Sequence, residues 1–163
     1  REENKTAAYW LLHGNDKVKE LEQQRQDILH SSPAPSHSRP ATATSGPGDP
    51  TAAKALKLAE LSQEAQAWLA VVSKVEGGLS LRDQVYLQLR RKYRNRRGRQ
   101  GWTAAVQAEF PSKMEELTGK DAEEFWISSR GTFSDWFGRI CDLTVREAIR
   151  EGLFPCCNKK EDS

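Results

Sequence analysis

Five of the seven prolines in this 163-residue chain fall within one stretch, residues 31–53. The rest of that stretch is mostly Ser, Thr, Ala and Gly, and it contains no large apolar side chain. Proline interrupts helices and sheets, and this composition offers too little apolar area to offset the entropy of ordering the backbone. The stretch therefore predicts a disordered linker, which divides the chain into a short N-terminal part and a longer C-terminal part.

The N-terminal part, residues 1–30, carries one short apolar stripe made by Val18, Leu21 and Ile28. Their spacing places all three on one face of a helix and predicts an amphipathic helix or a short coiled coil, interrupted upstream at Gly14. An isolated helix of a few turns is marginal in water. We therefore expect this stripe to bind a partner protein.

The C-terminal part, residues 54–155, shows helical periodicity and no convincing alternating strand pattern. Its clearest apolar stripe is formed by Leu58, Leu61, Ala65, Trp68, Val72 and Val75. We predict an all-α fold: a small multi-helix globular domain preceded by the amphipathic helix and the disordered linker. A polar tail, residues 156–163, follows it.

Caps and breakers predict the remaining helices. Ser80 and Asp83 form a capping box at the start of one helix. Pro111 is expected to separate two short helices, the second of which ends at Gly119. The last and longest helix is expected to begin near Thr132.

The two short helices around Pro111 also permit a helix–turn–helix interpretation, with residues 132–140 as the recognition helix. Acidic residues crowd the same region: Glu115, Glu116, Asp121, Glu123 and Glu124. An acidic surface is unfavourable for DNA contact, so we expect these helices to be ordinary core elements. The same carboxylates could pair with the basic residues described next and remove their charge.

A basic run occupies residues 90–99, where seven residues are basic and six of these are Arg. Guanidinium groups bind phosphate through two parallel hydrogen bonds and also stack on bases. We predict a nucleic-acid interface formed by Arg90, Arg91, Lys92, Tyr93, Arg94, Arg96, Arg97, Arg99 and Trp102. Phosphate contacts do not read bases, so low sequence specificity is expected, and DNA and RNA stay open.

The aromatic residues are divided in this prediction. Tyr93 and Trp102 are expected to stack on unpaired bases. Trp68, Trp126 and Trp136 each lie on an apolar stripe and are expected to belong to the core. If five basic residues contacted phosphates of B-DNA, the logarithm of the binding constant would fall with log salt at a slope of roughly −4 to −5.

Two alternatives place the run in protein interactions. A single basic stretch is typical of a nuclear-import signal. Leu87, Gln88, Lys92 and Arg97 also match part of the IQ motif, which binds calmodulin-like proteins along a basic helix, although Tyr93 replaces its glycine. In these alternatives the chain is an adaptor, with Val18, Leu21 and Ile28 as its second contact.

Several function classes are disfavoured. Residues 54–155 contain no histidine, the commonest general base, and no phosphate-binding glycine loop, so we expect no enzyme activity, catalytic residue or cofactor. Cys141, Cys156 and Cys157 lack the spacing of a zinc site, and their odd number favours a reducing compartment. We expect an intracellular protein, nuclear or cytoplasmic, without a membrane span; the sequence leaves its oligomeric state open.

Overall fold

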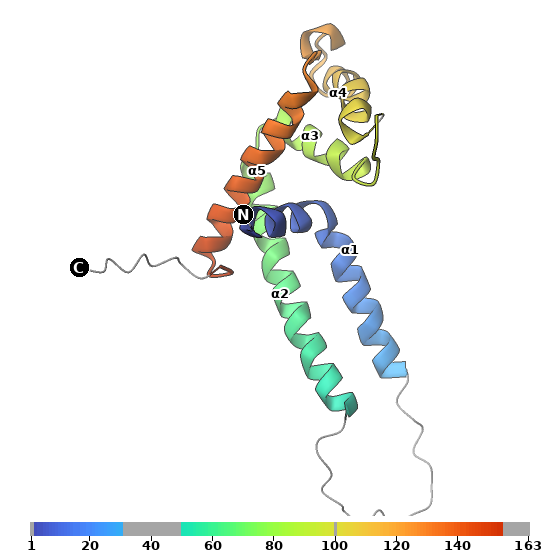
Figure 1. The fold of residues 1–163 in the computed structure, drawn as a ribbon, viewed down its shortest axis with the longest axis vertical. Helices are drawn as coiled ribbons and strands as arrows, with labels where there is room; N and C mark the ends of the chain where they lie inside the picture. The colour runs from blue at the N-terminus through green and yellow to red at the C-terminus, as the bar shows by residue number, and fades with distance from the viewer. Residues whose placement is uncertain (1, 31–49, 100, 155–163) are drawn as a thin grey trace, which may run out of the picture.

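The computed structural model describes residues 2–30, 50–99 and 101–154, and all regular structure within them is helical (Figure 1). The elements are α1 (Glu2–His30), α2 (Pro50–Gly78), α3 (Leu81–Lys92), α4 (Trp102–Thr118), the 3-10 helix η1 (Ala122–Phe125) and α5 (Arg130–Arg150). The predicted all-α class is confirmed. Most of the predicted linker, residues 31–49, and the polar tail lie outside the described residues.

α1 and α2 are antiparallel helices of 29 residues each, and their linker-proximal ends project away from the other helices (Figure 1). α2 begins at Pro50, inside the predicted linker, because proline at the first helical position loses no helical hydrogen bond. α1 continues through Gly14 as one helix, contrary to the sequence-based prediction, although it bends along its length (Figure 1). A Cβ atom at Gly14 would lie 3.0 Å from Leu69 Cδ2, so this glycine permits close approach of α1 to α2.

α1 contributes to the same hydrophobic core as the helices that follow residue 50. The indole of Trp10 stacks on that of Trp68, with ring centroids 5.8 Å apart and an interplanar angle of 6°. Ala7 and Leu11, which lie near Trp10 on α1, are also buried and belong to the same hydrophobic cluster. The N-terminal segment, treated as separate in the sequence analysis, is therefore packed onto the helical domain.

Pro111 does not separate two helices, as the sequence analysis expected; it lies inside the continuous helix α4. Pro111 is buried, as are Phe110 and Met114, so burial of this apolar face offsets the backbone hydrogen bond that proline cannot make. α4 ends at Gly119, as predicted, in the left-handed conformation (φ 68°). The two short helices that the helix–turn–helix interpretation requires around Pro111 are one helix, so that interpretation is wrong.

α5 begins at Arg130, two residues before the predicted start, and its first half supplies core side chains. Phe133 and Trp136 pack with Tyr86 of α3 and Phe110 of α4, with centroid distances of 5.5–6.1 Å. The Tyr86 hydroxyl also donates a hydrogen bond to the Phe133 carbonyl oxygen. The segment proposed as a recognition helix thus anchors α3 and α4.

Replacing Trp10 with Ala should lower the free energy of unfolding of the whole chain by about 3–5 kcal/mol, because the stack on Trp68 would be lost and a cavity left. Chemical denaturation followed by circular dichroism measures this. Tyr9→Ala is the control, since Tyr9 is exposed, and it should cost less. Equal stability of Trp10→Ala and the unmodified chain would contradict packing of α1 into the core.

Candidate nucleic-acid interface

The basic run begins on the last turn of α3 and continues into the connection to α4. The Ser80 hydroxyl caps the start of α3 by accepting the Asp83 backbone N–H at 3.3 Å, as the capping box predicted. Arg90, Arg91 and Lys92 occupy the last turn, where positive charge is favourable against the helix dipole. Arg90, Arg91 and Lys92 are therefore helical, whereas Arg94, Arg96, Arg97 and Arg99 lie in the connection between α3 and α4.

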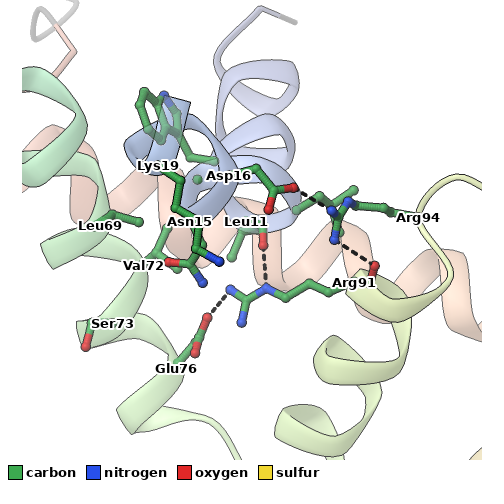
Figure 2. A pocket seen from close by; sticks show the side chains of 13 residues that line it. Leu11, Asn15, Asp16, Lys19, Leu69, Val72, Ser73, Glu76, Arg91 and Arg94 are labelled. Carbon is green, nitrogen blue, oxygen red and sulfur yellow. Dashed lines mark hydrogen bonds and ion pairs between the residues drawn. The ribbon is translucent and has the colours of Figure 1, made fainter. Parts of the chain in front are cut away.

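Arg91 reaches from α3 into a cleft between α1 and α2 (Figure 2). Its Nε–H donates to the Leu11 carbonyl oxygen of α1 at 2.6 Å, and its Nη2 forms an ion pair with the Glu76 carboxylate of α2. The cleft has a volume of about 510 Å³. One guanidinium group thus connects three helices.

Arg94 holds the chain just beyond the end of α3. Its guanidinium forms an ion pair with Asp16 of α1 and also donates to the Arg91 carbonyl oxygen at 3.2 Å (Figure 2). The same carbonyl oxygen also accepts the Arg94 backbone N–H at 3.3 Å, so Arg94 binds the end of α3 through both its backbone and its side chain. Arg94 is therefore both a helix cap and a link to α1.

Lys92 and Tyr93 both bind Glu109 of α4. The Lys92 ammonium lies 2.8 Å from each Glu109 carboxylate oxygen, and the Tyr93 hydroxyl donates to the same carboxylate. The hydrogen bonds from Lys92 and then Tyr93 lower the pKa of Glu109, and the bond to Glu109 raises the pKa of Lys92. This group ties the end of α3 to α4.

Arg90 is covered by aromatic rings. Its guanidinium carbon lies 4.1 Å from the Trp102 ring centroid and 5.2 Å from that of Phe137. Its Nε and Nη1 are buried and have no hydrogen-bond partner within the described part of the chain, and burial lowers the pKa of the group. The cation–π contacts offset part of this desolvation. Trp102, which was predicted to stack on a base, is half-buried and contacts Arg90 within the protein.

Four of the predicted contact residues are exposed. Lys92 is one of them and is paired with Glu109, and the other three are Arg96, Arg97 and Arg99. Among the residues that the structure describes, no carboxylate lies within ion-pair distance of any of these three arginines. The Arg96 guanidinium lies 4.8 Å from the centroid of the Tyr93 ring. Gly98 lies between Arg97 and Arg99 at φ 82°, a left-handed conformation that glycine adopts without strain. We call Arg96, Arg97 and Arg99 the loop arginines.

The carboxylates that pair with the run are not the acidic group that the sequence analysis considered. The carboxylates that pair with the run are Asp16 on α1, Glu76 on α2 and Glu109 on α4. Only Glu109 shares a helix with part of the acidic group, because Glu115 and Glu116 also lie on α4. No pattern in the sequence identifies the three paired carboxylates as partners, because each is a single acidic residue on an otherwise mixed helix face. The predicted acidic group is exposed instead.

The other predicted contacts also change place. Leu21 is 3% exposed, and Val18 and Ile28 pack against the same core, so the predicted protein-binding stripe lies against α2. In the IQ-like segment, Leu87 is 1% exposed and α3 ends before Arg97, so these residues do not form one exposed helix.

Trp126 is the exposed tryptophan that the sequence analysis missed. It is 58% exposed and lines a shallow depression of about 540 Å³ with Pro111 and Ala122. The prediction placed Trp126 in the core because it assumed a full helix there, whereas the structure has the short helix η1, and the backbone is extended at Trp126. Trp126 is therefore exposed and does not belong to the core, as the sequence analysis expected it to.

No cluster of three or more potential metal ligands occurs within residues 2–30, 50–99 and 101–154. None of the helices described there combines the length and apolar character needed to cross a bilayer. Comparison with protein-family models, with curated proteins and with solved structures gave no match to this chain. The functional argument therefore rests on the geometry of the basic run.

Arg91→Ala and Arg97→Ala should differ in stability, although both remove one arginine from the same run. Arg91→Ala should lower the free energy of unfolding by about 1–3 kcal/mol, because it leaves Glu76 and the Leu11 carbonyl without their partner. Arg97→Ala should change it by less than about 0.5 kcal/mol. Chemical denaturation of both variants checks this, and equal losses would contradict the division of the run.

The contacts of Glu109 should contribute stability that depends on pH. Because its pKa is lowered in the folded chain, this contribution is present above the ordinary carboxyl pKa of 4.5 and is lost as pH falls through the lower folded value. Unfolding curves of the unmodified chain and Glu109→Gln should therefore differ at pH 7 and converge below pH 4.5. A difference that is constant with pH would show that the Glu109 charge has no role.

Proposed function

We propose that this chain binds the phosphate backbone of nucleic acid through Arg96, Arg97 and Arg99. The observation that supports the proposal is their exposure, with no carboxylate within ion-pair distance in the described part of the chain, on one short loop. Arginine binds phosphate through the planar set of N–H donors on its guanidinium group. Because this group is weakly hydrated, removing its water on binding costs little free energy. Three such groups within four positions match a polyanion better than a single charge would.

The paired half of the run supports this function indirectly. Arg91, Lys92 and Arg94 fix the end of α3 to three other helices, and Arg90 packs under Trp102 at the start of α4. Both ends of the connecting loop are thereby held. A loop fixed in this way loses less conformational entropy when its arginines bind, which favours affinity.

The proposed binding is less extensive than the sequence alone suggested, and it lacks base stacking. Tyr93 is bonded to Glu109, and Trp102 is covered by Arg90. With phosphate contacts alone, we expect little discrimination between sequences and no preference for single strands, because duplex DNA has the higher charge density.

Binding of the full chain to fluorescent duplex and single-stranded DNA and RNA, titrated across salt, tests this function. With three phosphate contacts, the logarithm of the binding constant should fall with log salt at a slope of about −3 for B-DNA and about −2 for single strands. The triple variant Arg96→Ala, Arg97→Ala, Arg99→Ala should abolish most of the salt dependence.

The matched control replaces Lys54, Lys57 and Lys120 with Ala, which removes the same charge from exposed positions elsewhere. This control should retain most of the affinity. An equal loss in both triple variants would mean that only net charge matters. Absence of binding at low salt by the folded chain would contradict the proposal and favour a protein partner for the loop.

A further inference from the structure

Four of the five tryptophans contact another ring or a guanidinium group inside the protein. Trp10 and Trp68 stack on each other, and arginine side chains lie 4.1 Å from the ring centroid of Trp102 and 4.4 Å from that of Trp136. Trp126 is 58% exposed and has no such contact among the residues that the structure describes. Its indole is therefore open to a partner.

Trp126 lies beside a recess that a partner can fill. It follows η1, which is at one extremity of the molecule (Figure 1), and it borders the depression of about 540 Å³. The other lining residues are Ala108, Pro111, Ala122 and Glu123, so the floor is apolar and one wall carries a carboxylate. An exposed indole next to a recess is suited to anchor a protein interface, where tryptophan is enriched.

The charge around this depression selects a cationic partner. Between residues 115 and 126, five residues are acidic and one, Lys120, is basic, and all five acidic residues are exposed. Glu123 and Glu124 have no ion-pair partner in the described part of the chain. A guanidinium group can stack on an indole while its N–H donors reach neighbouring carboxylates. We call Glu123, Glu124 and Trp126 the Trp126 surface.

The loop arginines have the chemistry that the Trp126 surface requires. They are exposed, and they have no ion pair with any carboxylate of the described residues, those of the Trp126 surface included. The loop precedes α4 and η1 follows it, so the two complementary surfaces belong to different ends of this helix in the chain. We propose that the loop arginines of one copy dock on the Trp126 surface of a second copy.

This contact joins two different surfaces, so each copy keeps one loop or one Trp126 surface free for a further copy. Such head-to-tail contacts produce rings or open chains. Because the contact is ionic and exposed at its edge, salt should weaken it. If the proposed function also holds, nucleic acid competes for the same arginines, and self-association holds the loop closed until a polyanion displaces it. The association itself does not rest on the proposed function.

Sedimentation velocity of the full chain, without nucleic acid, tests the contact. At low salt, the sedimentation coefficient of the unmodified chain should rise with concentration, and at high salt it should return to that of a monomer. Trp126→Ala should weaken the association while its circular dichroism is unchanged, because the removed side chain is exposed.

Two further variants test the head-to-tail arrangement. One is Arg96→Ala, Arg97→Ala, Arg99→Ala, which lacks the basic loop, and the other is Glu123→Lys, Glu124→Lys, which lacks the acidic surface. Each should be monomeric alone. Mixed in equal amounts, they should form a dimer and nothing larger, because each supplies the one surface that the other lacks.

The matched control is Glu60→Lys, Glu64→Lys, which makes the same change of charge at exposed positions on α2 and should associate like the unmodified chain. Three results would overturn the proposal: an unmodified chain that stays monomeric at low salt and the highest soluble concentration, a mixture that stays monomeric, or a control that is monomeric. Trp126→Ala keeps all three loop arginines, so DNA binding by this variant tests the proposed function separately.

Discussion

The guanidinium of Arg91 is the polar contact that joins α1, α2 and α3. It extends from α3 into the cleft, where its Nε–H donates to the Leu11 carbonyl oxygen of α1 and its Nη2 forms an ion pair with Glu76 of α2 (Figure 2). The stack of Trp10 on Trp68 brings α1 and α2 together but does not involve α3. The bonds of Arg91 attach α3 to both of these helices. A partly buried charge with two partners resists displacement, because removing either partner leaves the charge unsatisfied.

The basic run, residues 90–99, is therefore divided into residues with partners inside the protein and residues without an ion-pair partner among the described residues. Arg91, Lys92 and Arg94 each meet a carboxylate from a different helix, and Arg90 meets aromatic rings. These four groups maintain the structure, whereas no carboxylate of the described residues pairs with the loop arginines. Charge counts along a sequence treat all seven alike, since they contain no information on which carboxylates will approach in space. The steep salt dependence expected from the sequence is accordingly reduced in the proposed function.

The elements that could be predicted are those controlled by local chemistry. The all-α class, the Ser80 cap and the Gly119 terminus follow from periodicity and from residues that act within one turn. Gly14 and Pro111 were misjudged because tertiary packing outweighs their helix-breaking tendency: one permits a close helix contact, and the other is buried. The contact of Arg90 with Trp102 was missed for a similar reason, since only the three-dimensional structure brings these two residues together.

The division of the basic run is tested most directly by the arginine Nε–Hε nuclear magnetic resonance spectrum of the full chain, recorded alone and with duplex DNA. The account predicts slow hydrogen exchange for Arg91, whose Nε–H donates to the Leu11 carbonyl oxygen, and fast exchange for Arg96, Arg97 and Arg99. On addition of DNA, the signals of those three should shift while that of Arg91 should not. Uniformly fast exchange, or equal shifts throughout the run, would contradict the division.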